Sequence, residues 1–305
     1  MTRAVSEADT ARDIVSETAP EQLSYEIDGL TYAGLAWGSP GQPVVLALHG
    51  WLDNALSFSV LAPALSGYRV VALDLSGHGL SSHRSADATY HIWDDLPQLE
   101  AIVALLDAPS VTIMGHSRGA GIALQLAAVL GERCHRVIVL DGLLPAWLDQ
   151  RDAADQLQRF VREKVKYASR DERYFESIDA FVERRRQYGF SDDSAYKLAP
   201  RALEQCPDGL RLRNDPRLYG ASALSLGPEQ RRQLYASVSA PTLCILAGDG
   251  LFNVSEVAQQ MFREAQDTMP HFICETVAGS HHLHMEAAAV AELAPRLQGF
   301  IQTGR

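Results

Sequence analysis

Cysteine, positive charge and long apolar runs are all scarce in this 305-residue chain. No apolar run approaches the roughly 18 residues of a membrane-spanning helix, so we expect no membrane span. The first 22 residues, MTRAVSEADTARDIVSETAPEQ, are polar and acidic and lack the apolar segment of a secretory signal. These features predict a cytoplasmic protein.

The four cysteines are widely separated, and their spacing is not that of a metal site. They are Cys134, Cys206, Cys244 and Cys274. Cys244 and Cys274 stand in apolar runs, where a free thiol behaves as a small hydrophobic side chain. We therefore expect four reduced cysteines, no metal site and no cofactor.

The formal net charge is −11, from 27 Lys and Arg against 38 Asp and Glu. Surfaces that bind nucleic-acid phosphates are usually basic, so the charge argues against a nucleic-acid partner. Residues 143–240 hold 17 basic and 15 acidic residues, whereas the remainder holds 10 and 23. The chain therefore divides into a near-neutral and an acidic unit.

Short apolar runs alternate with helical patterns over most of the chain. The runs PVVLALHG (43–50), YRVVALDLSG (68–77) and PTLCILAG (241–248) are bounded by glycine or proline and are typical of strands buried on both faces. Strands that alternate with helices predict an α/β fold, in which a mostly parallel sheet carries helices on both faces.

This alternation stops over residues 143–237, where the pattern is polar and mostly helical, without a convincing strand. We expect this segment to form a helical cap over the carboxyl ends of the strands, where open α/β folds bind ligands. Residues 22–142 and 238–305 would form the core domain, and residues 1–21 a flexible extension.

Eight aromatic residues of the cap could line an apolar substrate pocket, but the simpler expectation is that most form the cap's own core. They are Trp147, Phe160, Tyr167, Tyr174, Phe175, Phe181, Tyr188 and Phe190. The basic stretch ERRRQ (183–187) is expected to be a solvated or ion-paired helix face.

The segment VTIMGHSRGAGIALQL (111–126) reads as a strand, a break and a helix, with Ser117 at the break. A nucleophilic serine on a sharp strand-to-helix turn needs small neighbours such as Gly115 and Gly119. The alternative is an ordinary serine that caps the helix N-terminus. The strand-to-helix context favours the nucleophile.

Serine is a weak nucleophile unless a base activates it, and His281 is the expected base. It follows the last strand, after Ser117 in the chain, in the order nucleophile, acid, histidine. Its neighbours His282 and His284 are less favoured for this role. A metal site built from these three histidines is the rival interpretation, although adjacent histidines at one strand end point apart.

The acid that orients the histidine has two candidates. Asp249 closes the strand PTLCILAG and is the preferred one, although its short loop also fits a turn residue. Asp141, at the end of VIVLD, reaches the same edge of the sheet and is the alternative.

Acyl transfer also needs N–H groups that stabilise an oxyanion. The amide of Arg118, directly after Ser117, and the amide of Trp51, in the loop HGWLDN, are the expected donors. His49 and His78 are interpreted as structural residues that bond to backbone in the loops framing the pocket.

Taken together, these segments resemble the α/β-hydrolase superfamily from about residue 23 to residue 303. The resemblance rests on LHGW (48–51), DLSGHGLSS (74–82), GHSRGA (115–120), PTLCILAG and GSHHLHME (279–286). Within the superfamily, LHGWLDNALSF, GHGLSSH and NDPRLYGAS are similar to the serine hydrolase-like protein group. The resemblance implies a mostly parallel eight-stranded sheet, a helical cap between the sixth and seventh strands, and a Ser-His-acid hydrolase.

Two departures from the superfamily pattern matter. The superfamily often has G-x-x-D after the seventh strand, whereas Asp249 stands one position early, which keeps Asp141 open. Arg118 stands where many relatives carry a smaller or apolar residue, and its side chain would shape the pocket or bind a carboxylate. Ser117 itself argues against haloalkane dehalogenases and epoxide hydrolases, which resemble this fold but carry aspartate there.

The leading hypothesis is a serine hydrolase, a carboxylesterase that cleaves a carboxylic ester or related small acyl substrate through an acyl-enzyme. The same triad would also serve C–C bond, thioester or lactone hydrolysis, or acyl transfer. A third hypothesis is a non-catalytic binding protein of the same fold. The substrate stays open, as does the choice between monomer and homodimer.

Overall fold

A computed structural model describes residues 19–145, 153–224, 226–254 and 256–304. Within these residues the main sheet has eight strands. They are β1 (Glu21–Ile27), β2 (Leu30–Trp37), β3 (Val44–Leu48), β4 (Arg69–Leu73), β5 (Val111–His116), β6 (Cys134–Leu140), β10 (Thr242–Asp249) and β11 (Phe272–Ser280). Most of the extension expected over residues 1–21 lies outside the described residues.

The strands lie in the order β1-β2-β4-β3-β5-β6-β10-β11. Strand β2 is antiparallel to both β1 and β4, and all other neighbouring pairs are parallel. The predicted mostly parallel, eight-stranded sheet is confirmed. Because the parallel strands run the same way, the carboxyl ends of β3, β5, β6, β10 and β11 meet at one edge.

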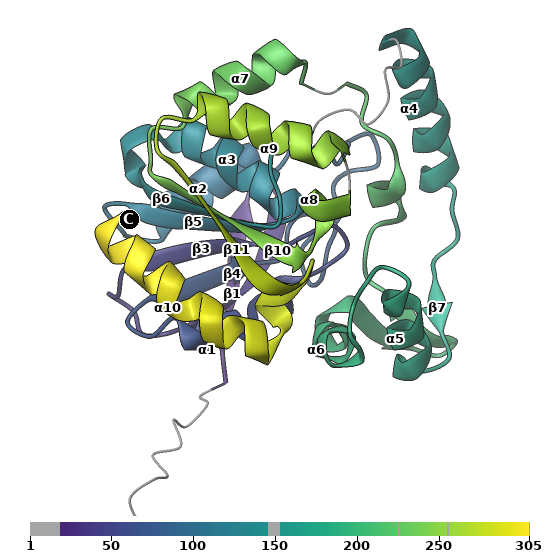
Figure 1. The fold of residues 1–305 in the computed structure, drawn as a ribbon. Coiled ribbons are helices and arrows are strands. Elements are labelled where there is room, and N and C mark those ends of the chain that lie inside the picture. Colours follow the sequence, from purple (N-terminus) through teal and green to yellow (C-terminus); the bar gives the residue numbers. More distant parts are fainter. Residues whose placement is uncertain (1–18, 146–152, 225, 255, 305) are drawn as a thin grey trace, which may run out of the picture.

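Helices cover both faces of the sheet (Figure 1), and every residue of β3 is therefore buried. One face packs against α2 (Leu96–Leu105), α3 (Arg118–Leu130), α7 (Pro228–Ser237) and α9 (Glu256–Thr268). The other packs against α1 (Leu61–Ala64) and α10 (Ala287–Thr303), with the 3₁₀ turns η1 (Ala55–Phe58) and η4 (Leu283–Met285). The remaining short elements of the core are α8 (Leu251–Val254) and η2 (Gly131–Arg133). No helix in the described part of the chain is long and apolar enough to cross a membrane.

Most of the segment between β6 and β10, up to η3, forms a smaller unit beside the sheet (Figure 1). Its elements are α4 (Ala153–Ala168), β7 (Tyr174–Phe175), α5 (Ile178–Arg186), α6 (Asp192–Ala202), β8 (Leu203–Cys206), β9 (Gly209–Leu212) and η3 (Pro216–Tyr219). The segment was expected to be mostly helical without a convincing strand, and this expectation missed β7, β9 and β8, which form a three-stranded antiparallel sheet. Strands of two to four residues are too short to produce a readable alternation.

The expected end of the cap at residue 237 also differs from the observed packing. Helix α7 lies against α3 and α9, and Tyr235 belongs to the core of the main sheet. The hydroxyl of Tyr235 accepts a hydrogen bond of 3.1 Å from the Leu144 amide. The structure therefore groups α7 with the main sheet.

Three of the predicted cap aromatics, Phe175, Phe181 and Phe190, lie in the cap's own core. Trp147 lies outside the described residues, while Phe160, Tyr167, Tyr174 and Tyr188 are half-buried or exposed. The cap core also includes Met285 of η4, so it packs directly on the main domain.

Candidate active site

Ser117 lies on a sharp turn between β5 and α3, with φ 51° and ψ −116°. A Cβ on Gly115 would lie 2.2 Å from the Gly119 carbonyl oxygen, and one on Gly119 would lie 2.1 Å from the Leu48 carbonyl oxygen. Both positions therefore require glycine. The Ser117 side chain makes no capping hydrogen bond to α3, which argues against the helix-cap interpretation.

His281 lies in contact with Asp141. Its Nδ1 donates a hydrogen bond of 2.6 Å to Asp141 Oδ2, and the carboxylate is completely buried. The amide of Ala247 donates to Asp141 Oδ1 at 3.1 Å, and the amide of Leu251 donates to Oδ2 at 3.0 Å. These three donors hold the carboxylate in one orientation, and a carboxylate so held fixes the orientation of the imidazole.

The expectation that Asp249 orients His281 is therefore wrong. Asp249 is the exposed last residue of β10. The loop between β10 and α8, with the residues on either side of it, supplies the Ala247 and Leu251 amides to Asp141, and no carboxylate in the described part of this segment bonds to His281. A Cβ on Gly250 would lie 2.4 Å from Asp141 Oδ2, so this loop can close over the carboxylate only with glycine there.

Ser117 is held next to the Asp141 strand end. Its amide donates to the Leu140 carbonyl at 3.0 Å, and a Cβ on Gly142 would lie 2.7 Å from the Ser117 Cα. Within the described residues, no hydrogen bond joins the Ser117 hydroxyl to His281. Such bonds are often long or misaligned in free enzymes and shorten when substrate binds.

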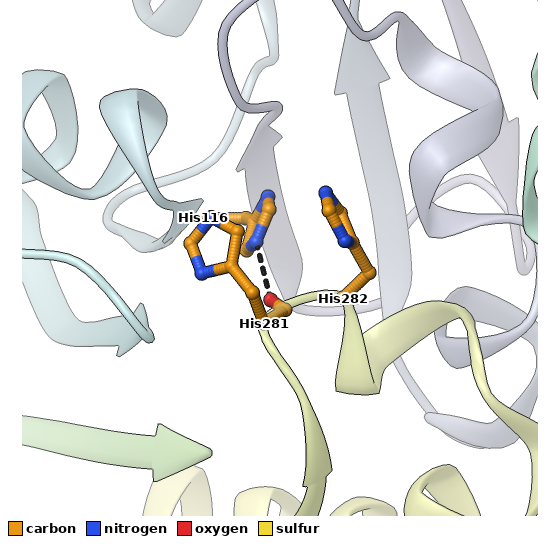
Figure 2. Close-up of side chains that lie close together, drawn as sticks. All are labelled: His116, His281 and His282. Carbon is orange, nitrogen blue, oxygen red and sulfur yellow. Dashed lines mark hydrogen bonds between the residues drawn. The ribbon is translucent and has the colours of Figure 1, made fainter. Parts of the chain in front are cut away.

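Residue His116, directly before Ser117, connects this turn to the histidine loop. Its Nε2 donates to the His281 carbonyl oxygen at 2.8 Å, and the two rings lie 4.7 Å apart (Figure 2). The two side chains of the proposed pair, Ser117 and His281, thus come from segments that a direct hydrogen bond joins.

The loop after β3 packs against the same turn. A Cβ on Gly50 would lie 2.9 Å from His116 Nδ1, so Trp51 follows a residue in contact with the nucleophile turn. Arg118 is the first residue of α3, where amides have no acceptor within the helix. Its guanidinium donates to the Tyr90 carbonyl at 2.8 Å, so the side chain binds backbone and not the expected carboxylate.

His49 and His78 bond to backbone in the loops that frame this site. His49 Nε2 accepts from the Leu75 amide at 3.0 Å, and its Nδ1 donates to the Gly50 carbonyl at 2.7 Å. His78 Nδ1 donates to the Ser76 carbonyl at 3.0 Å. The structural interpretation of both residues is confirmed.

Three further histidines are buried beside His281. Burial lowers the pKa of His116 and of His284 well below the ordinary value, and it lowers the pKa of His282 to about 4. All three are therefore uncharged at neutral pH. His284 Nε2 bonds to the Ser57 hydroxyl at 2.6 Å, so this nitrogen is not available to a common site with His281 and His282.

The histidines that do come together are His116, His281 and His282 (Figure 2), with one nitrogen of each within 4.8 Å of the others. Zinc binds nitrogen at about 2.0–2.1 Å, so tetrahedral ligands lie only about 3.4 Å apart. His281 Nδ1 and His116 Nε2 are already engaged with Asp141 and a carbonyl oxygen. The arrangement suits an oriented imidazole better than a metal ion.

Sequence reasoning missed a buried ion pair behind this cluster. Arg185 of α5 was expected on a solvated or ion-paired face; it is ion-paired but buried, donating to Asp53 Oδ1 at 2.5 Å, with side chains 7% and 1% exposed. Asp53 Oδ2 lies 3.8 Å from His116 Nδ1. A second buried pair joins Arg201 of α6 to Asp74 at 2.6 Å. Both pairs tie the cap to the loops around Ser117.

Replacement of Arg185 by alanine should lower the free energy of unfolding by about 3–5 kcal/mol, because it leaves a buried carboxylate without its partner. The control is Arg186→Ala, whose partner Asp192 is half exposed and whose loss should cost about 0–1 kcal/mol. Urea denaturation monitored by circular dichroism measures both. Equal losses in the two variants would contradict the buried pair.

Comparison with known proteins agrees with the fold. Residues 43–288 match the family described as alpha/beta hydrolase fold. A serine hydrolase-like protein of Dictyostelium discoideum is 30% identical over 285 residues, which cover 87% of this chain and 78% of the relative.

Two solved structures are similar over nearly the whole chain. A hypothetical protein of Pseudomonas aeruginosa PAO1 has a TM-score of 0.85 and 32% identity, and the match covers 92% of this chain and 99% of that one. A thioesterase domain from the curacin biosynthetic pathway has a TM-score of 0.80 and 27% identity, and the match covers 94% and 100%.

Proposed function

Because this chain belongs to the α/β-hydrolase fold family, we propose that it is a serine hydrolase that cleaves a carboxylic ester or related small acyl substrate. The observation that carries the proposal is Ser117, held at positive φ on a strand-to-helix turn beside a histidine oriented by a buried carboxylate. A strained turn of this kind persists only where the surrounding structure enforces it, and such turns cluster at active sites.

In the proposed mechanism Ser117 Oγ attacks the acyl carbon, and His281 Nε2 takes the hydroxyl proton. Asp141 accepts the Nδ1 proton in a hydrogen bond, which selects the tautomer with a free Nε2 lone pair and stabilises the imidazolium. His281 then passes the proton to the leaving group, and water hydrolyses the acyl-enzyme by the same steps.

The amides of Arg118 and Trp51 are the proposed donors to the oxyanion. Their placement is supported by the start of α3, which points amides toward the turn, and by the contact between Gly50 and His116. Loss of one such donor typically costs about 3 kcal/mol of transition-state stabilisation.

A fluorophosphonate probe tests the proposal, because it forms a stable adduct only with an activated serine. We expect the folded protein to be labelled and fragment-ion mass spectrometry to place the adduct on Ser117. Heat-denatured protein, in which the turn is lost, is the control and should stay unlabelled. A folded protein that does not react would favour the non-catalytic binding protein.

Thioester hydrolysis is the second candidate, favoured by the likeness to the curacin thioesterase domain at 27% identity. The proposed triad and oxyanion donors serve both reactions, since each passes through a tetrahedral intermediate. Values of kcat/KM for an oxygen ester and a thioester of the same acyl group would separate the two.

A further inference from the structure

A cavity of about 330 Å³ lies between the cap and the loop after β4, apart from the proposed triad. Its wall contains four arginines and the side chains of Asn214 and Tyr219. The arginines are Arg170, Arg173, Arg211 and Arg213. So many guanidinium groups around one cavity raise the question of what neutralises them.

Only part of this positive charge is balanced by the protein. Arg211 bonds to Glu172 at 2.6 Å and to Glu204 at 2.5 Å, and Arg213 lies 3.7 Å from Glu204. Arg170 and Arg173 have no carboxylate partner among the described residues, although Asp171 also lines the cavity.

The two unpaired guanidinium groups are held over aromatic rings. Arg170 lies 5.2 Å from the centre of the Tyr219 ring, and Arg173 lies 5.3 Å from that of Phe175. Such contacts orient a guanidinium without neutralising it, so its N–H groups stay available for a carboxylate or a phosphate.

Asn214, which also lines the cavity, contains a buried acceptor. Its Nδ2 donates to the Leu52 carbonyl at 3.2 Å, which leaves Oδ1 as the acceptor. The residue is 5% exposed, and Oδ1 has no hydrogen-bond partner. A buried acceptor without a partner costs free energy, which an N–H or O–H of a ligand would recover.

This cavity adjoins the proposed oxyanion loop through Tyr219. The Tyr219 ring lies 5.3 Å from the ring of Trp51, whose Nε1 donates to the Leu218 carbonyl at 3.0 Å. Arg173, Asn214 and Tyr219 also line a second, small pocket together with Leu52. The cavity and the loop after β3 are therefore in contact through Tyr219.

We propose that Arg170, Arg173, Asn214 and Tyr219 form an anion subsite for the end of the acyl substrate remote from the scissile bond. A carboxylate or phosphate binds the two guanidinium groups, and an N–H or O–H of the same arm donates to Asn214 Oδ1. This inference rests on the proposed function, because it names the substrate class of that reaction: acyl compounds with a distant negative charge.

Binding is measured first in the Ser117→Ala protein, so that the result does not depend on turnover. Calorimetry with adipate and with inorganic phosphate should detect binding that weakens about tenfold or more in Arg173→Gln and in Arg170→Gln. The matched control is Arg162→Gln, which removes the same charge from an exposed position of α4 outside the cavity.

Kinetics then separate the two sources of charge. Mono-p-nitrophenyl adipate against p-nitrophenyl hexanoate tests a carboxylate on the acyl side. Hexanoyl-coenzyme A against hexanoyl-N-acetylcysteamine tests a phosphate on the leaving side. For the pair whose charged member binds the subsite, the charged substrate should have a lower KM than the uncharged one. The ratio of these two KM values should shrink about tenfold in Arg173→Gln and Arg170→Gln and should be unchanged in Arg162→Gln.

Two outcomes would overturn the anion subsite: neither anion binds, or Arg173→Gln and Arg170→Gln bind both anions as the parent does. If binding depends on these arginines but folded protein resists the fluorophosphonate, the anion subsite stands and the proposed serine chemistry fails. If labelling succeeds and binding is unaffected by the substitutions, the proposed serine chemistry stands and the anion subsite fails.

Discussion

Replacement of Asp141 by asparagine should lower kcat about 10⁴-fold while leaving KM nearly unchanged. The carboxylate accepts the His281 Nδ1 proton at 2.6 Å in a fully buried position. An asparagine there has no charge to stabilise the imidazolium. Its N–H₂ group, if it faces the imidazole, also cannot accept the Nδ1 proton. Hydrolysis of p-nitrophenyl acetate measures the loss, and circular dichroism checks that the variant folds.

The matched control is Asp249→Asn, which makes the same chemical change on the neighbouring strand β10. Because Asp249 is exposed and His281 is bonded to Asp141, we expect kcat to stay within about threefold of the parent value. A large loss in Asp249→Asn with a small one in Asp141→Asn would reverse the assignment.

The sheet and the sharp turn at Ser117 could be predicted because their signals are local. A run such as VVLAL is apolar throughout because β3 is covered on both faces, and this pattern is visible without knowledge of its partners. The glycines around Ser117 likewise reflect contacts imposed by the turn itself, at Gly115 and Gly119.

The orienting acid could not be chosen from the sequence, because two aspartates end neighbouring strands at the same edge. Strands β6 and β10 are paired with Leu140 level with Ile245, so both apolar runs deliver an aspartate to the same edge, Asp141 directly after β6 and Asp249 at the end of β10. What separates them is the turn from β10 into α8, which directs the Ala247 and Leu251 amides at Asp141. Amide directions depend on the turn geometry and leave little trace in residue types.

Ion pairs between segments far apart in the chain also could not be predicted from the sequence. Asp53 and Arg185 are 132 positions apart, and Arg185 is followed by Arg186, whose side chain is half exposed. Only the packing of α5 on the loop after β3 distinguishes the buried arginine from its neighbours. The expectation of a solvated or ion-paired face therefore describes Arg186, whereas Arg185 is ion-paired but buried.

Substitution of Ser117 should separate activity from stability. Ser117→Ala and Ser117→Gly should each lower kcat about 10⁶-fold, because removal of a serine nucleophile leaves only binding and oxyanion stabilisation. Alanine keeps the Cβ that makes φ 51° unfavourable, whereas glycine adopts this conformation freely.

Strain of this kind costs about 1–3 kcal/mol, against about 0.5–1 kcal/mol for the extra entropy of an unfolded glycine. We therefore expect Ser117→Gly to be about 1 kcal/mol more stable than Ser117→Ala in urea denaturation, although both are inactive. A glycine variant no more stable than the alanine variant would mean that the turn carries no strain. Activity retained in either variant would remove Ser117 from the mechanism and direct attention to another nucleophile at the same strand ends.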